Sequence, residues 1–167
     1  NIDTEPLVFV YGDGKQEIAF SVTENINVIA EAENAEIIDA ESNNLEKVYG
    51  RKCYIQAINY ETAKVFLDNN HVQGHDKSTV YLGAFYNNEL IGVMSFIKHP
   101  NQKWILNRFA TNINKNVIGV GGKLFKHFLR LYDPMTVISF ADRRWTSTIK
   151  ENLYDKLGFI KDATLRP

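Results

Sequence analysis

The stretch WILNRFATNINKNVIGVGGKLF, residues 104–125, decides the fold. Its first part, residues 104–110, is an apolar run of strand length and predicts a buried strand. Gly119, Gly121 and Gly122 then open an amphipathic helix and leave its first backbone N–H groups uncovered. Because these groups and the positive end of the helix dipole attract anions, we expect a phosphate or pyrophosphate site here. A close-packed turn between strand and helix, without a ligand, explains the glycines equally well.

Two segments downstream favour the anion site. A second apolar strand, residues 136–141, leads into Asp142-Arg143-Arg144-Trp145, and a short helix follows with NLYDKLGF, residues 152–159. The pattern Asn116-x-x-Gly119-x-Gly121, followed by LYDKLGF, resembles the two signature motifs of the GNAT family of acyl-CoA-dependent N-acyltransferases. The resemblance covers about residues 51–165 and implies an α/β fold, a mixed central sheet flanked by helices.

The region before this stretch agrees with that order of elements. Residues 52–58 predict a strand, and residues 60–69 predict a helix with Asn59 as its N-cap. Two further strands, residues 80–86 and 90–97, are joined by a two-residue turn at Asn87-Asn88. The resulting order β-α-β-β-β-α-β-α, closed by a final strand, is the order that the family implies.

Charge divides the chain into two parts. Residues 1–50 hold 11 acidic and 2 basic residues, whereas residues 51–167 hold 9 and 17. A basic part attracts polyanions such as nucleic acid and coenzyme A. Residues 7–11 and 18–22 predict a β-hairpin. We therefore predict an acidic β-hairpin extension or small subdomain over residues 1–45, and a GNAT-like acyltransferase domain over residues 51–167 that is cut within its last strand.

The resemblance implies a cofactor site and a proton donor. Acetyl-CoA or another acyl-CoA is expected to be held at Asn116, Gly119, Val120, Gly121, Gly122 and Lys123. A backbone N–H within residues 109–111, where the central strand of the family bulges, would polarise the thioester carbonyl. Tyr154 matches the tyrosine that protonates the departing thiolate, and a phenol with a pKa of about 10 remains protonated at neutral pH. A core tyrosine is the alternative for Tyr154.

A narrower resemblance concerns the acceptor. LNRF at 106–109, ADRRW at 141–145 and NLY at 152–154 resemble a phage-type subset of the family. This subset includes the phage Mu type of DNA-modification protein and modules of phage homing-endonuclease-like proteins. It implies three catalytic residues, Arg108, Asp142 and Tyr154. Asp142 would act as the base for the amine and Arg108 would anchor it, although a purely structural ion pair is the alternative.

The same resemblance implies a substrate surface. His71 and Gln73 match the loop between the first helix and the next strand of that subset. Arg143, Arg144 and Trp145 suit a nucleic-acid strand, because guanidinium groups contact phosphates and an indole stacks on bases. Lys98, Lys103, Lys123, Lys126 and Lys150 would extend this surface if they share one face, although scattered solubilising lysines are the alternative.

Metals and membranes are not expected. The histidines at 71, 75 and 99 match no zinc-binding spacing, so we predict no metal site. Cys53, the only cysteine, is expected to be a small buried residue. The apolar runs are shorter than a membrane span and no signal peptide is visible, so we expect no membrane contact and a cytoplasmic protein, in the host cytoplasm if phage-encoded. No feature indicates an oligomeric state.

Three functions remain open. The preferred one is a GNAT-like transfer of an acyl group from acyl-CoA to an amine, in the modification of phage DNA or another nucleic acid. The alternative is a noncatalytic nucleic-acid-binding accessory module of a phage or mobile-element protein. Three departures from the family pattern favour this module: Asn116 replaces Arg or Gln, Ser147 replaces Asn, and Val72 replaces an aromatic residue. The third is an N-acetyltransferase for small molecules or proteins, which would have no affinity for DNA.

Overall fold

The computed structural model describes residues 7–12, 45–141 and 156–161 of the chain. Within these ranges the elements, in chain order, are β1 (Leu7–Gly12), β2 (Lys47–Tyr49), the 3-10 helix η3 (Gly50–Lys52), β3 (Tyr54–Ala57), α2 (Tyr60–Asn70), β4 (Val80–Tyr86), β5 (Glu89–His99), β6 (Lys103–Thr111), β7 (Asn116–Ile118), α3 (Val120–Tyr132), β8 (Thr136–Ala141) and β9 (Ile160–Lys161).

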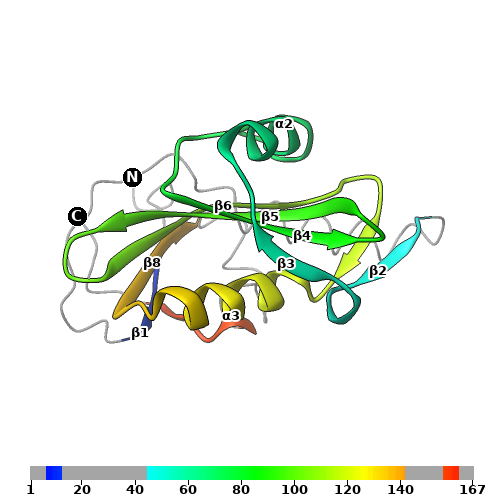
Figure 1. Ribbon diagram of the computed structural model, residues 1–167. Helices are drawn as coiled ribbons and strands as arrows, with labels where there is room; N and C mark the ends of the chain where they lie inside the picture. Colours follow the sequence, from blue (N-terminus) through cyan, green and yellow to red (C-terminus); the bar gives the residue numbers. More distant parts are fainter. Residues whose placement is uncertain (1–6, 13–44, 142–155, 162–167) are drawn as a thin grey trace.

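One mixed sheet organises the described residues. Its strand order is β3-β4-β5-β6-β8-β1-β9, and the second, smaller sheet joins β2 to β7. Neighbours in the large sheet are antiparallel except β6 and β8, which are parallel. Helix α2 covers one face of the large sheet and α3 covers the other (Figure 1). The predicted α/β architecture, a mixed sheet flanked by helices, is therefore confirmed at this level.

Several local predictions are confirmed in detail. The Oδ1 atom of Asn59 accepts the N–H of Thr62 at 2.8 Å, so Asn59 caps α2 as expected. Asn87 and Asn88 have φ values of 50° and 64°, the left-handed pair that a two-residue hairpin turn requires. Cys53 is buried, and its burial raises the pKa of its thiol. Within the described residues, no helix is long and apolar enough to cross a membrane.

The two parallel strands at the centre of the sheet pair over a short length. Residues 103–105 of β6 lie opposite residues 136–138 of β8. Beyond this point β6 continues to Thr111 in pairing with β5, and β8 continues to Ala141 in pairing with β1. The paired part of β6 and β8 therefore ends just before the polar residues of β6.

A β-bulge changes the direction of those polar residues. Arg108 pairs with Ser95 and Leu106 pairs with Phe96, so Asn107 is an extra residue on β6. Leu106 and Phe109 consequently both face the core beneath α3, although an odd spacing would place them on opposite faces of a regular strand. We expected the bulge within residues 109–111. It lies earlier, where the two adjacent polar side chains must both leave the apolar core.

The two helices bury different kinds of core. Under α3, Phe128 stacks on Phe96 with ring centroids 3.6 Å apart, and Trp104 meets the same Phe128 ring at 5.1 Å. Under α2, the buried side chains are fewer, and the cluster is Ala63, Phe66, Leu67, Tyr81, Val93 and Ala110. The α3 side therefore holds most of the aromatic packing in the described residues.

Strand β1 confirms one prediction and shows pairing that the sequence did not predict. The strand expected at residues 7–11 forms, as Leu7–Gly12. It lies inside the large sheet, where β8 pairs with all six of its residues and β9 pairs with Phe9 and Val10. At those two residues no edge is left for the hairpin partner that we expected at 18–22, which itself lies outside the described residues. The described pairing of β1 is therefore entirely long-range, and the hairpin stays a prediction.

Candidate functional site

The N-terminal end of α3 offers backbone donors on an open side. Gly119, the N-cap, has a φ of 80°, a left-handed conformation that suits glycine. The first helical bond runs from the N–H of Lys123 to the carbonyl of Gly119 at 3.4 Å. The N–H groups of Val120, Gly121 and Gly122 have no acceptor among the described residues. A Cβ atom added at Gly119 or Gly122 would meet no atom of the described residues within 4 Å, so the described part of the chain leaves this side of the helix end open.

A second segment closes the other side of this helix end. A Cβ atom at Gly50 would lie 2.6 Å from the carbonyl oxygen of Gly119 and 2.9 Å from the nitrogen of Val120. The backbone of η3 therefore rests directly on the first peptide of α3. No pattern in the sequence predicted this contact. The available signal was the glycine itself, which is required where two backbones touch.

The predicted cofactor residues divide into three groups. Gly119 and Gly122 lie on the open side of the helix end. Val120 and Gly121 are buried, and so is Asn116, whose N–H donates to the carbonyl of Glu46 at 2.8 Å. The Oδ1 atom of Asn116 has no partner among the described residues. The side chain of Asn116 therefore belongs to the interior rather than to the open side of the turn.

Lys123 forms the third group by itself. Its Nζ atom donates a hydrogen bond to the carbonyl oxygen of Cys53, the residue just before β3. This bond ties the first turn of α3 to the edge of the sheet. The ammonium group of Lys123 adds positive charge beside the helix end. Its hydrogen bond to Cys53, however, holds the fold together and does not point to a ligand.

The bulged part of β6 carries a polar cluster on the opposite face of the sheet, toward α2. The Nδ2 atom of Asn107 donates to Ser78 Oγ at 2.8 Å, and Ser78 Oγ donates to Ser95 Oγ at 3.0 Å. The Nε atom of Arg108 donates to the carbonyl of Gly74 at 3.2 Å. These bonds hold the loop between α2 and β4 against the sheet. Sequence reasoning did not assign Asn107 or Ser78; the signal was a pair of polar residues inside a buried strand.

His71 and Arg108, assigned to different roles from the sequence, are brought together here. Both are buried, with 5% and 4% of their surface exposed. Burial, and the Arg108 guanidinium beside it, lower the pKa of His71 to about 4. The N–H of Gln73 donates to His71 Nδ1 at 3.1 Å, so the proton of the neutral ring lies on Nε2. This Nε2 atom has no hydrogen-bond partner among the described residues.

Arg108 also has an acidic neighbour. Its Nη2 atom lies 3.9 Å from Oδ2 of Asp76, a carboxylate that is about half exposed. The distance is at the limit of an ion pair, so the carboxylate only partly balances the buried guanidinium. The side chain of Gln73 is exposed, and only its backbone joins the cluster.

Six predicted residues lie outside the described ranges: Asp142, Arg143, Arg144, Trp145, Lys150 and Tyr154. The parallel register places Ile105 opposite Ile138, and three further residues along each strand lead to Arg108 and Ala141. Asp142 is the next residue after Ala141. The proximity of Arg108 to Asp142 therefore remains a prediction, and the register is consistent with it.

Comparisons with known proteins add information on the fold alone. No family model matches the chain, and no curated protein matches it. A solved structure with a similar fold is that of a functionally unknown conserved protein from Staphylococcus epidermidis ATCC 12228. The TM-score is 0.55 and the identity 13%, and the match covers 95% of this chain and 58% of that one. The chain thus spans less than two thirds of the protein it matches.

Proposed function

We propose that this chain is an acyl-CoA-dependent N-acyltransferase of the GNAT type, with an amine of a nucleic acid as its acceptor. One observation carries the proposal. Three backbone donors, at Val120, Gly121 and Gly122, have no acceptor among the described residues, and the described chain leaves one side of this helix end open at Gly119 and Gly122. A row of N–H groups at a helix N-terminus binds the phosphate oxygens of a nucleotide carrier.

The arrangement around this helix end supports the same proposal. The parallel strands β6 and β8 stop pairing before Asn107, and α3 follows β6 through β7. Acyl-CoA would supply an activated thioester, and the N–H groups of residues 120–122 would bind its pyrophosphate. The chain's own groups then position the acceptor amine and move its proton. Arg108, fixed by its bond to Gly74, is suited to orient an anionic partner or the acceptor.

Two proton-transfer roles complete the proposal. Asp142 takes the proton of the attacking amine, and Tyr154 returns a proton to the leaving thiolate. Both residues lie outside the described ranges, so these roles rest on the sequence motifs. The register of β6 and β8 supports a role for Arg108 in the same site, because Arg108 lies three residues after Ile105, and Ala141, the residue before Asp142, lies three residues after Ile138.

Replacement of Gly122 tests the cofactor site without endangering the fold. Gly122 is the third residue of α3 and its surroundings are open, so Glu is accommodated and is favoured near a helix N-terminus. We expect Gly122→Glu to raise the melting temperature slightly and to abolish binding of acetyl-CoA in calorimetric titration. Gly122→Gln is the matched control, because it adds the same bulk without the negative charge and should retain most of the affinity.

Two outcomes would contradict the enzyme. The first is that the unchanged chain does not bind acetyl-CoA. The second is that Gly122→Glu binds as tightly as Gly122→Gln, since phosphate bound at this helix end must respond to a carboxylate placed beside it. Retained affinity in Gly122→Glu would place the cofactor elsewhere.

The second candidate function is a noncatalytic nucleic-acid-binding module, and two structural observations favour it. Gly50 rests on the first peptide of α3, and the Asn116 side chain is buried, so part of the expected cradle serves packing. This module requires binding of nucleic acid without any binding of acyl-CoA. The calorimetric titration of the unchanged chain therefore separates the two candidates.

A further inference from the structure

Strand β3 ends the large sheet, and its outer edge has no partner among the described residues. Its one neighbour in the strand order is β4, and Figure 1 shows β3 in front of β4. The N–H of Ile58 donates to the carbonyl of Tyr81 at 3.0 Å, so residues 58, 56 and 54 turn their backbone groups toward β4. Ile55 and Ala57 therefore turn their N–H and C=O groups away from the sheet, where no described backbone group meets them.

The chain closes this edge only before the strand begins. The N–H of Cys53 donates to the carbonyl of Gly50 at 2.9 Å, and the carbonyl of Cys53 accepts the hydrogen bond from Lys123. Helix α2 begins at Tyr60, just after the strand. The open stretch therefore has two defined ends, and the backbone groups of Ile55 and Ala57 are available to a strand from another chain.

The usual protection of an edge strand is missing from β3, apart from its short length. Lysine, proline and bulges keep edge strands from pairing with other chains. Residues 54–58 read YIQAI, without charge or proline, and the pairing of β3 with β4 has no bulge. Tyr54, Gln56 and Ala57 are exposed, and Tyr54 stacks on Phe85 with ring centroids 5.3 Å apart. The edge is therefore uncharged and accessible, and its aromatic side chain is held in place.

The edge is complementary to itself. A two-fold axis at Gln56 places Ile55 of one copy opposite Ala57 of the other, and each such pair exchanges both of its main-chain hydrogen bonds. The large Ile55 then meets the small Ala57 on the α3 side of the sheet, where Ile55 packs on the core. On the α2 side, Tyr54 meets Ile58 of the second copy. Backbone groups and side-chain sizes thus both fit a second β3.

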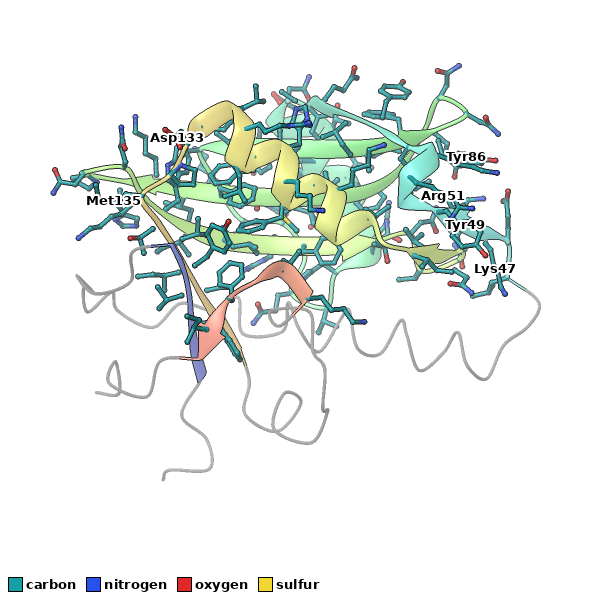
Figure 2. The ribbon with its side chains drawn as sticks, turned by 90° about the horizontal axis from the view of Figure 1, so that it is seen from below. Lys47, Tyr49, Arg51, Tyr86, Asp133 and Met135 are labelled. Carbon is teal, nitrogen blue, oxygen red and sulfur yellow. The ribbon has the colours of Figure 1, made fainter. Side chains whose placement is uncertain are left out.

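The charges at the two ends of β3 have opposite signs. Arg51 and Lys52 are exposed just before the strand, and Glu61 is exposed in the first turn of α2 just after it. Figure 2 shows Arg51 at the same end of the molecule as Tyr86, beside the start of β3. None of the three charged side chains forms an ion pair with a described residue. Antiparallel pairing of β3 with itself brings the basic end of each copy to the acidic end of the other.

We propose that a second copy of this chain pairs with the outer edge of β3, antiparallel about a two-fold axis at Gln56. The two large sheets then form one continuous sheet. Because the paired stretch is short, the dimer is weak and forms at high protein concentration. The proposal is independent of acyl-CoA and of the proposed reaction.

Disulfide cross-linking tests the register. Residue 56 of one copy lies directly opposite residue 56 of the other, with Cα atoms about 4.5 Å apart, so Gln56→Cys should form a disulfide-linked dimer under mild oxidation. Ala57→Cys is the matched control, because the two cysteines would lie roughly 8 Å apart, beyond the reach of a disulfide. The unchanged chain controls for Cys53, which is buried. Equal cross-linking of the two variants would overturn the proposal, since random collisions would then explain it.

Sedimentation equilibrium tests the dimer itself, at concentrations from about 5 μM to about 500 μM. We expect the unchanged chain to self-associate, and Gln56→Lys and Gln56→Glu each to weaken association about tenfold, because like charges would face each other at the axis. An equal mixture of these two variants should recover the association, because opposite charges then meet. Both substitutions are at an exposed side chain, so melting temperatures should change little.

Three results would overturn the proposal. The first is an unchanged chain that stays monomeric at the highest concentration. The second is a dimer that persists unchanged in Gln56→Lys, since the interface would then lie elsewhere. The third is a mixture of the two charged variants that associates no better than either alone, because residue 56 would then not meet its own copy. Binding of acetyl-CoA is measured separately and decides only the proposed enzyme.

Discussion

Helices α2 and α3 cover opposite faces of the same sheet, yet they differ in the caps and charged residues at their N-terminal ends. Helix α2 begins after the N-cap Asn59, carries Glu61 in its first turn, and places Lys64 four residues before Asp68. The hydrogen bonds from His75, and to a smaller extent the charge of Lys64, lower the pKa of Asp68. Helix α3 begins at a left-handed glycine without a side-chain cap and has no acidic residue at all. The N-terminal end of the first helix therefore has the cap and the charge that stabilise a helix. The N-terminal end of the second has neither, and it is the end at which we propose that acyl-CoA binds.

The largest expected difference concerns the cores. Phe128 of α3 is fully buried and stacks on Phe96, whereas Phe66 of α2 is 8% exposed in a smaller cluster. We expect Phe128→Ala to lower the free energy of unfolding by about 4 kcal/mol, and Phe66→Ala by about 3 kcal/mol. Urea denaturation of both variants measures the difference. A larger loss in Phe66→Ala would contradict the view that α3 holds the main aromatic core.

A pH effect belongs to the α2 face. The pKa of His71 is lowered to about 4 in the folded chain, from an ordinary 6.5. Between these values the unfolded chain binds a proton that the folded chain does not, so stability falls as the pH drops from 6.5 to 4, by about 3 kcal/mol at most. We expect His71→Asn, whose Oδ1 can still accept the N–H of Gln73, to flatten this dependence in urea denaturation at several pH values.

The matched control is on the other helix. His127→Asn should leave most of the pH dependence in place, because His127 is half-buried and its pKa is lowered less. If the two variants flatten the dependence equally, the acid sensitivity does not come from the buried cluster of His71 and Arg108.

Substitutions at the N-terminal ends of α2 and α3 should change the stability of the folded chain in opposite directions. Asn59→Ala removes the bond to the N–H of Thr62 and should destabilise the chain by about 1 kcal/mol. Gly122→Ala fills open space in the first turn of α3 and should stabilise it by about 0.7 kcal/mol, because glycine disfavours a helix. Melting temperatures measure both. A destabilised Gly122→Ala variant would show that the helix end is more tightly covered than its open side indicates.

The smallest effect comes from charge reversal at one lysine on each helix. Lys126→Glu places a carboxylate four residues before Arg130 and should stabilise α3 by about 0.3 kcal/mol. Lys64→Glu places a carboxylate four residues before Asp68 on α2, and the repulsion between these like charges should lower the melting temperature. Calorimetry at low salt compares the two. If both substitutions change the melting temperature in the same direction, the two helices do not differ in the way proposed.

Patterns within a segment predicted most of the elements. The apolar run at 104–110, the cap at Asn59 and the asparagine pair at 87–88 each act within a few residues, and the structure contains the strand, the helix and the turn. The glycines at 119–122 likewise predicted the start of α3. Whether that helix end binds acyl-CoA stays a prediction, because the sequence pattern is the same for a ligand site and for a packing turn.

The features that the sequence did not predict depend on contacts between segments that are far apart in the chain. Strands β2 and β7 are three residues each and pair across most of the described chain, so neither has a local signal. The contact of Gly50 with Gly119 follows from that pairing. His71 and Arg108 meet only because the loop after α2 folds onto a bulge of β6. The roles of Asp142 and Tyr154 stay predictions.

The place of β1 has a consequence for biosynthesis. Leu7 pairs with Ala141 and Phe9 pairs with Lys161, so a strand that is made early must wait for strands that are made much later. Until those strands are made, β1 has neither of its partner strands, and its unpaired backbone edges can associate with other chains. We therefore expect slow closure of the sheet to limit the yield of folded protein.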